Sequence, residues 1–214
     1  MFSLRMELIE LIKAISTKES DTLRNGSVSD LLKLYEQQEY AVLFKQNHPG
    51  QSYLFDEWVA DEEYQQVMQD TISLYRSGNY KNLEVKISKP QANFLSKYGE
   101  VCVINKTMTD EYLNTPLKTE SLDIYVRHLA NNQWRVLSYQ GTELPENFKE
   151  FFPDFPKNIK LKSAKINGLD PAESSYVMSV DYLKNAKIEI TDEIQQSLDQ
   201  AKKDTKARLK LNGF

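Results

Sequence analysis

The stretch that decides the fold is Ile124-Tyr-Val-Arg-His-Leu-Ala-Asn-Asn-Gln-Trp-Arg-Val-Leu-Ser-Tyr139. Apolar and polar residues alternate on both sides of Asn131-Asn132, which is typical of two antiparallel strands. Asparagine tolerates the left-handed backbone that a two-residue hairpin turn requires. We therefore predict strands at 120–129 and 133–141 joined by a tight turn. One face of the hairpin should carry the alternating side chains Leu122, Ile124, Val126 and His128, together with Trp134 and Val136 or their neighbours.

The same period of two continues upstream, which predicts a larger antiparallel sheet. Residues 83–88 alternate and end near Pro90, as a strand with one solvent-exposed face does. Residues 91–98 and 100–109 should form a second hairpin around Tyr98-Gly99. Cys102 lies inside the apolar run of the latter strand and should be a buried filler.

Helical spacing dominates the residues before the sheet. Residues 3–15 predict a docking helix, followed by a polar connector at 16–26. A second helix should begin at Ser29-Asp30 and end at 47–50, and a short aromatic element should fill 51–60. A third helix should run from Asp61 to Gly78. Its expected buried side consists of Tyr64, Val67, Met68, Thr71, Ile72 and Tyr75.

Beyond residue 142 the pattern is mixed. A short helix at Pro145–Phe152 should be followed by a lysine-bearing edge strand at 159–166. Asp170-Pro171 begins a helix, residues 187–190 alternate, and Thr191 caps a last helix with a basic end. The apolar stripe of that helix is narrow, so it should rest on its own domain or on a partner. That stripe is Ile194, Leu198, Ala201 and Leu209.

Helices first and an antiparallel meander afterwards predict an α+β fold, with N-terminal helices packed on a curved, cone-like sheet. We expect three parts: an N-terminal helix and connector at 1–26, the cone-like domain at 27–142, and a C-terminal α/β extension at 143–214 packed on or beside it. The element order and the closing strand Gln133-Trp-Arg-Val-Leu-Ser138 resemble the nuclear transport factor two-like, cystatin-like superfamily. The resemblance covers about residues 28–142.

That resemblance implies a pocket between the concave sheet and the helices, and some members of the family use an Asp with a Tyr to abstract a proton beside a carbonyl. The residues placed to line such a pocket are Asp56, Asp110, Asp123, Tyr112, Tyr125 and His128. None of them matches a particular catalytic position of the family. Without such a pocket, His128 is an ordinary strand residue and Asp123 and Arg127 form an exposed same-face pair. His48, before Pro49, reads as a helix-end residue.

Composition excludes several function classes. The net charge of −4 and the pI of 5.4 argue against a protein that binds nucleic acid by neutralising phosphates. One cysteine allows no internal disulfide, and two histidines cannot make a His-rich metal site. The sequence has no glycine-rich phosphate loop, zinc-type cysteine pair or Gly-x-Ser-x-Gly motif, so we expect no metal and no cofactor. Acidic residues interrupt the apolar run of the first ten residues, so this run is expected to be neither a signal peptide nor a membrane span. We therefore expect a cytoplasmic location.

Two functions remain as hypotheses. The first is a non-enzymatic protein that binds a partner protein, of the kind of a bacterial immunity protein that neutralises a toxin. The second is a small-molecule binder or isomerase-like enzyme with a pocket between sheet and helices. The aromatic residues serve either as core or as a contact surface. The predicted binding residues are Tyr53, Trp58, Tyr125, His128, Trp134 and Tyr139.

Overall fold

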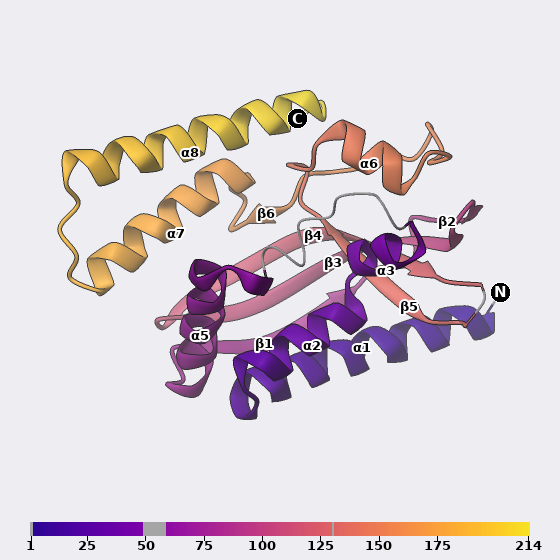
Figure 1. Ribbon diagram of the computed structural model, residues 1–214, viewed down its shortest axis with the longest axis horizontal. Helices are drawn as coiled ribbons and strands as arrows, with labels where there is room; N and C mark the ends of the chain where they lie inside the picture. The colour runs from indigo at the N-terminus through magenta and orange to yellow at the C-terminus, as the bar shows by residue number, and fades with distance from the viewer. Residues whose placement is uncertain (1, 49–58, 130) are drawn as a thin grey trace.

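The protein has an α+β fold in which a six-stranded antiparallel sheet is covered by helices (Figure 1). The structure, a computed structural model, describes residues 2–48, 59–129 and 131–214. The strands are β1 (Tyr80–Ile87), β2 (Ala92–Ser96), β3 (Gly99–Tyr112), β4 (Thr115–Arg127), β5 (Trp134–Tyr139) and β6 (Lys165–Ile166). The described helices are α1 (Phe2–Asn25), α2 (Val28–Gln38), α3 (Tyr40–Asn47), α5 (Glu62–Arg76), α6 (Pro145–Phe151), α7 (Pro171–Asn185) and α8 (Asp192–Leu211).

The long β3–β4 hairpin is the centre of the sheet, and β1 and β5 flank it in the order β1-β3-β4-β5. β2 extends the sheet beside β3, and β6 does so beside β4. The turn between β3 and β4 uses Leu113 and Asn114, both with positive φ. The register, with Val103 opposite Ile124, places one apolar row on each face of the sheet.

The predicted two-residue turn at Asn131-Asn132 is wrong. β4 ends at Arg127 and β5 begins at Trp134, so the connection is longer. Asn132 does adopt a positive φ of 56°, and its N–H donates to the His128 carbonyl at 2.9 Å. The Asn131 side chain accepts from the Gln133 N–H at 3.0 Å, so side-chain hydrogen bonding stabilises a wider loop than the sequence pattern indicated.

The two faces of the sheet carry different cores. Val101, Ile124 and Val126 lie on the face that packs against α3 and α6, with Tyr139 of β5 on the same side. On the opposite face Cys102, Ile104 and Tyr125 pack against Ile12 of α1, and Trp134 and Val136 join them. The predicted burial of Cys102 is therefore confirmed. Trp134 and Val136 do not share a face with Ile124; their neighbours in β5 do.

α1 is longer than predicted, because residues 16–25 continue the helix instead of forming a connector. Leu23, in the polar stretch, is buried against Leu31 of α2 and Ile72 of α5, so one apolar contact holds the last turns in place. The N-cap of the next helix is Ser27, two residues before the expected Ser29. Ser27 and Asp30 form a reciprocal capping box.

The predicted second helix is two helices. The backbone of Glu39 is extended (φ −76°, ψ 129°), ends α2 and begins α3, and forms a single parallel bridge with Val136 at the outer edge of β5. The third predicted helix is confirmed as α5, with Asp61 as its N-cap and Gly78 at positive φ after its end. Its Ile72 is buried, whereas Val67, expected inside, is 54% exposed.

The C-terminal residues form a helical hairpin of α7 and α8 beside the sheet (Figure 1). Asp170 and Thr191 cap these helices as predicted. The expected edge strand at 159–166 is reduced to the two residues of β6, and residues 187–190 form no strand. The Asn212 side chain donates to the Gly141 and Glu143 carbonyls, which fastens the end of α8 to the loop after β5. No helix within the described ranges has the length and apolar character needed to cross a membrane.

Candidate functional site

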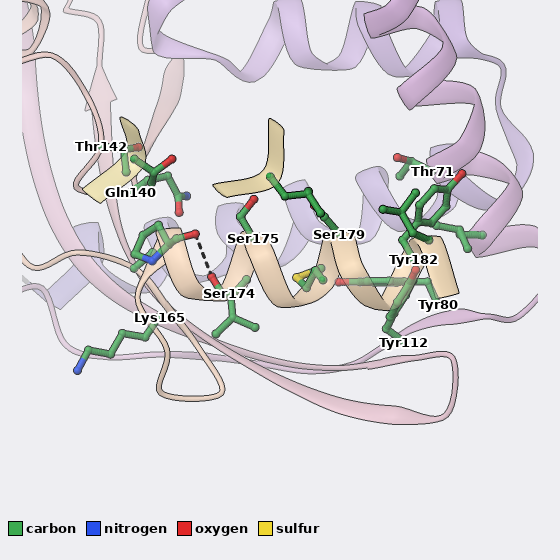
Figure 2. A pocket seen from close by; sticks show the side chains of 18 of the residues that line it. Thr71, Tyr80, Tyr112, Gln140, Thr142, Lys165, Ser174, Ser175, Ser179 and Tyr182 are labelled. Atoms are coloured by element: carbon green, nitrogen blue, oxygen red, sulfur yellow. Dashed lines mark hydrogen bonds between the residues drawn. The ribbon is translucent and has the colours of Figure 1, made fainter. Parts of the chain in front are cut away.

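An open groove of about 1040 Å³ lies between the α7–α8 hairpin and helices α1, α2 and α5 (Figure 2). Half of its 24 lining residues bear a hydroxyl group: five tyrosines, four serines and three threonines. Only two, Glu19 and Lys165, are charged. In a chain with 27% charged residues, this groove is thus a weakly charged, hydroxyl-rich surface with an apolar base.

Regular spacing places these hydroxyl groups. Ser175, Ser179 and Tyr182 follow one another on α7 at intervals of four and three, so they project from one face of the helix into the groove (Figure 2). Tyr80 and Tyr112 are register partners in β1 and β3 and lie side by side on the same face of the sheet. The end of the groove formed by Tyr75, Tyr80, Tyr112 and Tyr182 is called the tyrosine end below.

A cluster of buried and half-buried acids lies behind the groove, between the sheet and α1. The Asp123 side chain is fully buried and accepts three hydrogen bonds, from Lys106 Nζ at 2.6 Å, Ser138 Oγ at 3.1 Å and the Tyr125 hydroxyl at 3.2 Å. Glu19, Glu39 and Asp110 are close enough for the same lysine to stabilise their negative charges. Four carboxyl groups therefore share Lys106, whose shortest contact is with Asp123.

Burial makes this arrangement costly for charged acids. Burial, followed by the charges of Glu19 and Asp123, raises the pKa of Glu39 from 4.5 to about 7. Burial also raises the pKa of Glu19, although the Tyr35 hydroxyl donates to its Oε1 at 3.2 Å and opposes the shift. With a pKa of about 7, the Glu39 carboxyl group is protonated in about half of the molecules at neutral pH.

Asp110 is the acid nearest to the tyrosine end. Its side chain is 1% exposed, burial raises its pKa, and the Tyr80 hydroxyl donates to it. Its Oδ1 has no hydrogen-bond partner within the described part of the chain. The Tyr75 and Tyr80 rings are 4.6 Å apart at their centroids, and both line the groove. Asp110 is thus separated from the groove by a layer of tyrosine.

The predicted binding residues do not form one surface. Tyr125 is buried on the face that α1 covers, and Trp134 is half-buried beside it, whereas Tyr139 is buried on the opposite face. His128 follows the end of β4, and its Nδ1 is buried without a partner within the described part of the chain. Three residues singled out from the sequence lie outside the described residues: Tyr53, Asp56 and Trp58.

Asp123 and Arg127 are not an exposed pair. Asp123 is completely buried and bound to Lys106, and Arg127 forms an ion pair with Glu100 and lies over the Trp134 ring at 5.7 Å. The expected pocket over the sheet is filled where Ile12 packs on Tyr125, and the groove lies further along the same face.

Sequence reasoning missed Glu19, Glu39 and Lys106. Glu19 had a signal: it lies seven residues after Ile12 and four before Leu23, both buried, so helical periodicity puts all three on one face of α1. Lys106 lies between Asn105 and Thr107 in β3, and nothing local distinguishes it from a lysine on an exposed face.

A smaller cavity of about 380 Å³ lies near the end of α3. His48 stacks on the Phe44 ring at 4.2 Å, and its Nδ1 lies 2.9 Å from the Phe44 carbonyl oxygen. Tyr98 meets both rings edge-on. The prediction that His48 is a helix-end residue is confirmed, because its backbone forms the C-cap of α3.

Comparison with family models, with curated proteins and with solved structures finds no match. The groove and the acid cluster are therefore interpreted from their own chemistry. No group of three His, Cys, Asp or Glu side chains within the described residues is arranged to hold a metal ion.

Proposed function

We propose that this protein is a non-enzymatic binding protein and that the groove holds a segment of a partner protein. The composition of the groove carries the proposal: five tyrosines, four serines and apolar residues, with two charged side chains in 24. Tyrosine is enriched where binding energy concentrates, because it buries a large rigid ring and retains a polar hydroxyl. Serine adds adaptable hydrogen bonds at little cost in side-chain entropy.

The size of the groove supports a macromolecular ligand. Its volume of about 1040 Å³ is at the upper limit of small-molecule sites, which are typically about 300–1,000 Å³. Ser175 of α7, which lines the groove, is exposed to solvent. An open groove suits a chain segment that enters and leaves, whereas a small molecule gains more from an enclosed cavity.

The chemistry of the lining also favours binding over catalysis. No histidine lines the groove, and Ser174 donates to the Pro171 carbonyl within its own helix at 3.4 Å. A serine nucleophile needs a base within hydrogen-bond reach. The serines of α7 therefore support recognition of a partner.

An immunity protein that neutralises a toxin fits this proposal. The net charge of −4 favours encounter with a basic partner through long-range attraction. The helices-first order and antiparallel sheet also support a relationship to the nuclear transport factor two-like superfamily, and that relationship is part of the proposal, as is a cytoplasmic location.

Glu19 favours a second candidate function, an isomerase-like enzyme. It lines the groove, burial raises its pKa, and Tyr35 donates to it, so a carboxyl group and a phenol meet at one wall. A base with a raised pKa beside a donor is the arrangement that proton transfer requires. In that case a small carbonyl compound would bind at this wall, and Glu19→Gln would abolish its turnover.

Site-specific photo-crosslinking in the native cell tests the proposal. A photoreactive phenylalanine analogue replaces Thr71 on α5 or Ser175 on α7, both of which line the groove. The control replaces Leu95 on β2, which is 70% exposed and does not line the groove. We expect both groove positions to crosslink the same segment of the same protein, identified by mass spectrometry, and Leu95 not to. Equal crosslinking from all three positions would refute the assignment to the groove.

A further inference from the structure

The tyrosine end of the groove combines negative charge with aromatic rings. Glu19 lines the groove, and Asp110 accepts a hydrogen bond from the hydroxyl group of Tyr80. Asp110 and Tyr112 are two residues apart in β3, so both side chains point to the face of the sheet that forms the groove. Burial, followed by the negative charges of Glu19 and Asp110, raises the pKa of Tyr75, so both carboxyl groups act on this end of the groove.

Positive charge from the protein itself is scarce here. Lys106 is engaged by Asp123 at 2.6 Å, and Arg24, which also influences Tyr75, is on the exposed side of α1. Lys165, the one basic residue of the lining, is at the other end of the groove (Figure 2). Lys106, whose Nζ pairs with Asp123, also acts on Glu19 and Asp110, so one lysine serves several carboxyl groups and the site is short of positive charge. The Oδ1 of Asp110 is buried there without a hydrogen-bond partner among the described residues.

Aromatic rings complete the chemistry. The Tyr75 and Tyr80 rings are 4.6 Å apart, and Tyr112 is the register partner of Tyr80. A ring face attracts an ammonium or guanidinium group within about 6 Å of its centroid, and the attraction is stronger when water is excluded. Negative charge behind the rings increases this attraction.

We propose that the tyrosine end of the groove binds a lysine or arginine side chain of the partner protein, held over Tyr75, Tyr80 and Tyr112 with Glu19 and Asp110 as its counter-charges. The assignment to a protein side chain rests on the proposed function; the recognition of an organic cation rests on the geometry alone. The remainder of the groove, which is weakly charged, receives the apolar and hydroxyl-bearing residues around that side chain.

The test is to titrate the full chain with two matched probes and to monitor its amide chemical shifts by NMR. Nα-acetyl-arginine amide is the cationic probe, and Nα-acetyl-citrulline amide is a neutral probe of the same length. We expect the cationic probe to shift amides near Glu19, Tyr75 and 110–112 and to bind at least about tenfold more tightly than the neutral one. Added salt should weaken this binding, because exposed charge interactions are screened.

Variants assign the effect to the two acids. Asp110→Asn keeps the shape of the side chain, and we expect it to weaken the cationic probe about tenfold. Glu19→Gln, on a different element, provides the same measurement if Asp110→Asn folds poorly. Asp70→Asn is the charge-matched control, because Asp70 is exposed on α5 and accepts a hydrogen bond from Gln66 outside the groove. This control should change the affinity for the cationic probe by less than about twofold.

Equal affinity for the two probes, or shifts confined to other parts of the chain, would overturn the cation site. A peptide library displayed against the protein separates this result from failure of the proposed function. Groove-binding peptides rich in arginine or lysine support both proposals, whereas groove-binding peptides without basic residues leave the proposed function standing and remove the cation site. Binding of the arginine probe without any peptide binding would retain the cation site and assign it to a small organic cation.

Discussion

Replacing Glu39 by glutamine should stabilise the protein above pH 7 and have little effect near pH 4. Glutamine resembles the protonated carboxyl group, which the folded state favours because burial and the charges of Glu19 and Asp123 raise the pKa of Glu39 to about 7. In the unfolded chain this pKa is near 4.5. The folded state therefore binds the extra proton between these values, and stability falls as pH rises from about 4.5 to about 7 and then stays constant.

The size of the effect follows from the shift. Raising a pKa from 4.5 to about 7 corresponds to roughly 3 kcal/mol at about 1.36 kcal/mol per unit. The Glu39 side chain is partly exposed, so solvent screening reduces this to about 1–2 kcal/mol. For a chain of this length, each kcal/mol changes the melting temperature by about 2–4 °C. Glu39→Gln should therefore raise the melting temperature by about 2–8 °C at pH 8.

Thermal unfolding followed by circular dichroism between pH 4.5 and pH 8.5 measures this directly. The matched control is Glu189→Gln, at an exposed position between α7 and α8. Glu19 and Asp110 contribute their own pH dependence in both variants, so the difference between the variants isolates Glu39. Parallel pH profiles for the two variants would show that the carboxyl group of Glu39 is not held protonated by its surroundings.

Three further predictions test other parts of the structure. Lys106→Met should destabilise the protein by about 3–5 kcal/mol in urea unfolding, because Asp123 is left buried without its cation; the double variant Lys106→Met/Asp123→Asn should recover more than half of the loss, and no recovery would contradict the pairing. Gly99→Ala should cost at least about 1 kcal/mol, since a Cβ there would lie 2.3 Å from the Arg127 carbonyl oxygen; Gly168→Ala, at positive φ but with no atom within 4 Å, separates steric clash from backbone strain in the same melting experiment. Cys102 should react with an aromatic disulfide reagent only on the timescale of unfolding, because burial raises its thiol pKa to about 12; rapid labelling of the folded protein would place this thiol at the surface.

Local signals in the sequence predicted much of the fold. Asp61, Asp170 and Thr191 were identified as helix caps because a cap depends on the few residues that follow it. Alternation of apolar and polar residues identified β3, β4 and β5. This signal is also local, because a strand with one covered face shows the alternation within its own sequence. These features gave the α+β class correctly.

The candidate site depended on contacts between distant residues. Asp123 alternates with apolar neighbours as an exposed residue would, and only Lys106 on the next strand and α1 above it reveal that it is buried. The break at Glu39 is set by its bridge to Val136, far along the chain. The walls of the groove include α1, α5 and α7, which are far apart in the sequence, so no local pattern could reveal the groove.

The β3–β4 hairpin has a consequence for the order of folding. It contains both members of the Lys106–Asp123 pair, and its strands are joined by a short turn, so this pair forms from local contacts, which form early. Glu19 and Glu39 reach the pair only when α1, α2 and α3 dock on the sheet. Repulsion among the acids therefore arises only when these helices dock, a step that we expect to follow the transition state for folding. Raising the pH should accelerate unfolding and leave the refolding rate nearly unchanged.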